Sequence, residues 1–148
     1  MRIAVVIALA TALLSVGCSA SVGAINHDPQ AAAREAEEFV RLCVVDDDVP
    51  AAYAMFGEEA QEQVDIATFT QQMEIVNEGG RPRSVHATSW ESLPGERALV
   101  VFLVGTDVPR EYYYRVVMEG TLGTGYRPFA VFRGDGPYPE SSLRQDLK

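Results

Sequence analysis

The sequence contains few of the residues from which metal and catalytic centres are usually built. It has two histidines and two cysteines. His27 and His86 are isolated, with no metal-ligand residue at helical or hairpin spacing, so the sequence contains no zinc motif. No serine lies in a nucleophile-elbow context, and no glycine-rich loop precedes a helix. We therefore predict no catalytic residue, no metal and no cofactor.

Basic residues are also scarce, and all of them except Lys148 are arginine. The chain has 12 Lys and Arg against 21 Asp and Glu, which gives a formal net charge of −9. An acidic surface repels the phosphates of nucleic acids and the anionic headgroups of lipids. The charge therefore argues against nucleic-acid binding and against direct electrostatic docking on a membrane.

An apolar run lies close to the N-terminus. It extends from Ile3 to Val16, is interrupted only by Thr11 and Ser15, and follows Arg2. A membrane-spanning helix needs about 20 apolar residues, and this run is shorter. A basic start, a short apolar segment and a boundary of small residues are typical of a secretory signal.

The boundary, Ser15-Val16-Gly17-Cys18, resembles the bacterial lipoprotein signal, although leucine stands one place earlier than usual, at Leu14. The resemblance implies that residues 1–17 are removed and that Cys18 carries lipid. Residues 18–28 would then tether a domain that lies outside the cytoplasm, in the cell envelope, to a membrane that it does not span. The alternative is an ordinary signal peptide that is cut elsewhere, with Cys18 incidental.

Cys43 has no partner for an intramolecular disulfide if Cys18 is lipidated. It lies on the apolar side of a predicted helix, and no cationic residue stands beside it, so we expect a buried and unreactive thiol. The 131 residues that remain after residues 1–17 are enough for one domain and too few for two.

Helical signals occupy the first half of this domain. Asp28 is predicted to cap a first helix that begins at Pro29 and ends around Val45, and Asp65 is predicted to cap a third helix. The second helix is predicted from Val49-Pro50 to Gly57, with one more turn over 58–63. The apolar positions of these helices recur at helical spacing. These positions are Ala32, Ala36, Phe39, Val40, Cys43, Ala52, Tyr53, Phe56, Ile66, Phe69, Met73 and Val76.

Three consecutive carboxylates, Asp46-Asp47-Asp48, separate the first two helices. A calcium loop alternates its ligands and adds a glycine and a distal glutamate, which are missing here. We therefore interpret the triplet as a solvated turn that caps the next helix.

After Gly80 the period of the pattern changes to two. Strands are predicted over 82–92, 97–105, 110–119 and 126–133, with a turn at Pro94-Gly95. In the third strand Tyr112, Tyr114, Val116 and Met118 share the face expected to point inward. Pro128 cannot donate to a ladder, which places the last strand at a sheet edge or Pro128 at a position that does not pair.

Helices followed by strands indicate an α+β fold. We predict three N-terminal helices packed on a curved four-stranded antiparallel sheet over residues 29–133. Phe39, Phe69 and Met73 are expected to cover the sheet. Residues 134–148 are rich in proline, glycine and serine, and a loosely held tail is predicted there.

Three segments carry a resemblance to a known superfamily. They are "EAEEFVRLCVVDDDVPAAYAMF", "ATFTQQMEIVNEGGRPRSV" and "GYRPFAVFRGD". In their order and packing positions they resemble the cone-shaped α+β, cystatin-like superfamily named after nuclear transport factor two, and within it small exported domains of unknown function. Such folds serve as isomerases, dehydratases, ligand binders and structural partners, so the resemblance assigns no activity.

The resemblance also implies a pocket at the concave face of the sheet. Strict alternation places His86 and Trp90 on one face, with Tyr112 and Tyr114 on the inward face of the third strand. His86 is a candidate general base, or else a surface histidine. The two tyrosines are candidate hydrogen-bond donors to a ligand, or else core aromatics.

Two functions follow from these observations. The first is a membrane-anchored lipoprotein whose domain is a non-enzymatic binding or interaction module, with another envelope protein or a small ligand as its partner. The second is a small-molecule binder or an isomerase-like or dehydratase-like enzyme, whose concave pocket is lined by His86, Tyr112 and Tyr114 and is open rather than filled by core side chains.

Overall fold

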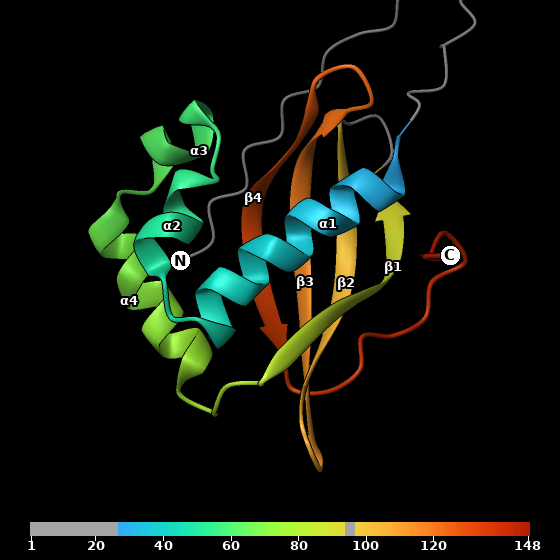
Figure 1. Ribbon diagram of the computed structural model, residues 1–148. Coiled ribbons are helices and arrows are strands. Elements are labelled where there is room, and N and C mark those ends of the chain that lie inside the picture. The colour runs from blue at the N-terminus through green and yellow to red at the C-terminus, as the bar shows by residue number, and fades with distance from the viewer. Residues whose placement is uncertain (1–26, 94–96) are drawn as a thin grey trace, which may run out of the picture.

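The computed structural model describes residues 27–93 and 97–148 (Figure 1). Helices pack against an antiparallel sheet with the strand order β4-β3-β2-β1-β5. The strands are β1 (Ser84–Ser92), β2 (Ala98–Asp107), β3 (Arg110–Thr121), β4 (Gly125–Gly134) and β5 (Gln145–Asp146). The predicted α+β class is confirmed, and the sheet gains a short fifth strand. The predicted signal, Cys18 and the Pro94-Gly95 turn lie outside the described residues.

Four α-helices precede the sheet instead of three, because the turn predicted over 58–63 is a helix of its own. The helices are α1 (Pro29–Val40), α2 (Val49–Ala54), α3 (Glu58–Gln63) and α4 (Ile66–Asn77), and α1 continues as a π-helical turn, η1 (Arg41–Val45). The carboxylates of Asp28, Asp48 and Asp65 accept hydrogen bonds from backbone amides in the first turns of α1, α2 and α4. These are the three predicted caps.

The core lies between α1 and the sheet, which α1 crosses (Figure 1). Phe39 of α1 is fully buried, and Phe69 and Met73 of α4 are each 2% exposed. The predicted inward face of β3 is also buried, from Tyr112 to Met118. The burial of these apolar side chains is the main stabilising contribution to the fold.

Helices α2 to α4 stand beside β4, whereas α1 lies over the strands (Figure 1). A cluster of four aromatic rings joins this group to α1. Phe69 lies at the centre of the cluster, with its ring centroid 5.0 Å from Phe56, 5.9 Å from Tyr53 and 6.2 Å from Phe39. Because the cluster holds α4 to the other helices, α4 can extend past the edge of the sheet.

A β-bulge interrupts β1. Ala87 pairs with Leu103 and Ser89 pairs with Phe102, so Thr88 is the extra residue. The backbone N–H of Ala87 donates to a carboxylate oxygen of Glu37 in α1 at 2.6 Å, which fastens the helix to the bulged segment. An extra residue reverses the alternation of side chains beyond it, so every later position of β1 changes face.

The C-terminal tail, predicted to be loose, packs on the sheet. Gln145 and Asp146 form β5, which pairs with β1. The guanidinium of Arg144 lies 3.7 Å above the ring of Phe102 on the face of β2 turned away from α1. The tail is anchored by a cation–π contact and by a two-residue strand. Neither contact can be predicted from the local sequence of the tail.

Candidate binding groove

The structure separates the residues that were predicted to share a pocket. Because of the bulge, His86 pairs with Val104 on the outer face of the sheet, while Trp90 pairs with Val101 on the inner face. The prediction that these two residues share a face is therefore wrong. His86 is exposed, and Trp90 is partly buried against the core.

The two tyrosines lie in the interior, on the side of the sheet opposite His86. Tyr114 is 0% exposed, and its hydroxyl is buried without a hydrogen-bond partner in the described structure. Burial raises the pKa of Tyr114 to about 12, which keeps the phenol neutral. Tyr112 is 6% exposed, and its ring lies 4.8 Å below the guanidinium of Arg133. The structure therefore does not bring His86 and a tyrosine hydroxyl to one cavity.

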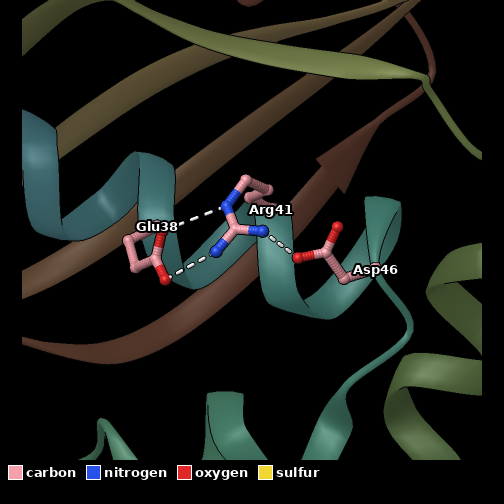
Figure 2. Close-up of polar contacts among 3 residues, drawn as sticks. All are labelled: Glu38, Arg41 and Asp46. Carbon is pink, nitrogen blue, oxygen red and sulfur yellow. Dashed lines mark hydrogen bonds and ion pairs between the residues drawn. The ribbon is translucent and has the colours of Figure 1, made fainter.

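The acidic triplet has a structural role at each of its positions. Asp46 pairs with Arg41, which also binds Glu38 (Figure 2). Asp47 pairs with Arg81 at 2.8 Å, which lowers the pKa of its carboxyl group, and Asp48 caps α2. No group of three or more potential metal ligands occurs within the described ranges. The interpretation of the triplet as a solvated, capping turn is confirmed.

Cys43 is buried, as predicted. Its side chain is 0% exposed, and burial raises its pKa to about 12 from an ordinary value of 9.0. The thiolate is the nucleophilic form of cysteine, and this environment disfavours it at neutral pH.

An apolar groove of about 450 Å³ lies between α4 and the edge strand β4, and we call it the α4–β4 groove. Phe69 and Met73 form its floor, and Ile75 and Val76 form the helical wall. Residues 129–132 of β4 form the opposite wall. Its volume falls within the range of sites that bind small molecules or side chains.

The lining of the groove can bind but carries no acid, base or nucleophile. Its polar side chains are Gln63 and Gln72, and none of its lining residues is Asp, Glu, His, Cys, Lys or Arg. General acid–base and nucleophilic catalysis need such groups within hydrogen-bond reach of the substrate. The groove therefore favours recognition of an apolar surface over chemistry.

Arg133 joins the two walls of the groove at one end. From β4 its guanidinium donates to the backbone carbonyl of Val76, at 2.6 Å, and to that of Gly80, at 2.9 Å. A Cβ at Gly79 would lie 2.9 Å from a guanidinium nitrogen of Arg133, so glycine allows this close approach. Arg133 thus sets the distance between the end of α4 and β4.

A second hollow, of about 430 Å³, continues the groove along β4. It shares Ile75, Val76, Val131 and Phe132 with the groove and adds Glu78, Gly79, Arg133 and Asp135. The combined depression is therefore elongated along the strand, apolar over most of its length and acidic at the end near Gly79.

An exposed apolar side chain, Ile75, marks the groove, and the sequence analysis did not use it. Ile75 is 69% exposed and lies off the apolar stripe of α4. Phe132 also lines the groove, but it pairs with Arg115, so its side chain lies on the outer face of the sheet, where the Arg115 guanidinium covers its ring. A large apolar residue at a position expected to be polar was the available signal.

Comparison of the chain with models of protein families, with curated proteins and with solved structures finds no match. What the structure defines is the class: an α+β domain in which N-terminal helices pack against an antiparallel sheet. Within residues 27–93 and 97–148, no helix is both long and apolar enough to cross a membrane.

Proposed function

We propose that the protein is an exported lipoprotein held to a membrane by lipid on Cys18, and that its domain is a non-enzymatic binding module. The α4–β4 groove is its binding surface, and an apolar portion of another protein of the cell envelope is its ligand. The observation that carries the proposal is the composition of this groove, which combines a sizeable apolar volume with no catalytic side chain.

The sequence supports the exported location. A basic start, an apolar run and Gly17-Cys18 have the order of a lipoprotein signal. The order of helices and antiparallel strands supports kinship with the superfamily of nuclear transport factor two, which remains a prediction. The enzyme hypothesis gains no support, because His86 and the two tyrosines lie on opposite faces of the sheet.

The groove is tested by site-specific photo-crosslinking in the cells that produce the protein. A photoreactive amino acid replaces Ile75, and in a matched control it replaces Ile66. Both isoleucines belong to α4 and are exposed, at 69% and 44%, but only Ile75 lines the groove. We expect a discrete crosslinked protein from position 75 and none from position 66. Equal patterns from the two positions, or no product, would contradict the proposal.

The anchor is tested by replacing Cys18 with serine. A serine cannot form the thioether that carries the lipid, so Cys18→Ser should abolish labelling with radioactive palmitate and move the protein from the membrane fraction to the soluble fraction. Cys43→Ser serves as the control and should retain the label. If Cys18→Ser stays membrane-bound without label, the anchor lies elsewhere.

A further inference from the structure

We infer that the occupant of the α4–β4 groove is an extended protein segment that adds to β4 as an extra strand, with apolar side chains in the groove and a basic side chain near Glu78 and Asp135. This inference rests on the proposed function and names the conformation and chemistry of the partner.

The two edges of the sheet differ in whether another strand covers them. The chain covers β1 with its own strand β5, whereas β4 has no strand on its outer side among the residues that the structure describes. Edge strands present rows of unpaired N–H and C=O groups, and proteins usually protect them. Pro128 and the bulge at Phe129, which has no partner in β3, disrupt the first half of β4, and this leaves residues 130–134 as the regular part of the edge.

The open part of this edge coincides with the groove. Residues 129–132 line the groove, and the second hollow continues to Arg133. At a rise of about 3.3 Å per residue, this wall matches an extended segment of about five residues. A strand pairs its backbone with one wall of such a groove and points alternate side chains into it, which is the mode called β-augmentation.

Other occupants fit less well. An acyl chain would fill the apolar volume but could not pair with the backbone of β4, where among residues 129–132 the Phe132 carbonyl already accepts a hydrogen bond from the Tyr138 hydroxyl. A second copy paired through β4 would bring its own α4 into the same space (Figure 1). Helices about 10 Å wide do not fit side by side over strands spaced about 4.8 Å apart.

The negative charge at one end of the depression favours a bound segment with a basic residue at that end. Glu78 and Asp135 line the second hollow. The one cation beside them in that lining, Arg133, already donates to the carbonyls of Val76 and Gly80. With a net charge of −9, the chain as a whole also attracts a basic partner. A lysine or arginine at this end of the segment would complement the two carboxylates.

The test is a selection from a displayed library of random decapeptides, with the full chain in detergent as the target. Recovered peptides should alternate apolar residues and carry a basic residue at one end. Ile75→Glu should weaken their binding at least tenfold, and the matched control Ile66→Glu should change it less than twofold. Hydrogen exchange of those amides in residues 130–134 that point away from β3 should slow at least tenfold when a peptide binds.

A backbone control separates strand addition from apolar contact alone. N-methylation of alternate residues of a recovered peptide removes donors but keeps the side chains, so one of the two N-methylated registers should lose binding at least tenfold. If both registers bind unchanged, strand addition is wrong although the groove still binds protein. If no peptide is recovered and lauric acid binds instead, the extended segment is wrong. The crosslinking at Ile75 tests the proposed function separately.

Discussion

Replacing Arg133 with methionine should loosen α4 from β4. The change removes two hydrogen bonds, to the carbonyls of Val76 and Gly80, and a cation over the ring of Tyr112 at 4.8 Å. A hydrogen bond from a charged donor contributes about 1.5–3 kcal/mol, and a cation–π contact contributes about 0.5–1 kcal/mol at exposed sites. Because Arg133 is only partly buried, the low end of each range applies, and we expect a loss of about 3.5 kcal/mol in the free energy of unfolding.

Arg115 provides a matched control for this prediction. Its guanidinium lies 4.8 Å from the ring of Phe132 and 5.4 Å from that of Tyr138, but within the described residues it makes no hydrogen bond to a helix carbonyl. Arg115→Met should therefore cost about 1–2 kcal/mol, for two cation–π contacts of about 0.5–1 kcal/mol each. Both variants keep an apolar stem, so packing changes little.

The assay is urea unfolding followed by far-ultraviolet circular dichroism and by the fluorescence of Trp90, the one tryptophan. Hydrogen exchange of Val76 and Asn77, at the end of α4, should accelerate in Arg133→Met and stay unchanged in Arg115→Met. Equal losses of stability in the two variants, with slow exchange at α4 retained, would refute the idea that Arg133 sets the width of the groove.

Three further predictions concern the core, a cap and alkaline pH. Phe69→Ala should cost about 3–5 kcal/mol in urea unfolding, since its ring is 2% exposed; a cost near 0.5 kcal/mol would place it outside the core. Asp28→Ala should cost about 1 kcal/mol through loss of the α1 cap, and Asp28→Asn should restore most of that stability. Folding raises the pKa of Cys43 from 9.0 and of Tyr114 from 10.0, each to about 12. The stability that these two groups add to the folded state is therefore complete below pH 9 and is lost between pH 9 and 12. In that interval the free energy of unfolding falls by up to about 1.4 kcal/mol per pH unit for each group. Cys43→Ala should reduce this slope, and an unchanged slope would show that folding does not raise the pKa of the Cys43 thiol.

The sequence signals that proved reliable are local ones. Asp28, Asp48 and Asp65 each cap a helix because the carboxylate bonds an amide three residues later, a contact that the order of residues alone permits. The alternation over residues 110–119 predicted the inward face of β3 correctly. No extra residue interrupts β3, because the bulge opposite Val117 and Met118 lies in β4. Pro128 was also interpreted correctly, because its missing N–H excludes it from a central ladder.

Failures occurred where a distant residue decides the local geometry. Alternation failed in β1 because the extra residue Thr88 reverses the faces beyond it, and Glu37, fifty residues earlier, bonds the bulged segment. The tail was expected to be loose because it is rich in proline, glycine and serine. Its anchors are Phe102 and the edge of β1, which are far away in the sequence.

By itself, the sequence determined the fold class, the element order, the burial of Cys43 and the absence of a catalytic motif, because each follows from residue type and short-range spacing. The tertiary structure decided which sheet edge is covered and where an apolar surface is left open. The α4–β4 groove exists only because α4 and β4, separated by the other three long strands, meet around Arg133. No periodicity within one element encodes the space between two, and for that reason the binding surface became visible only in the folded chain.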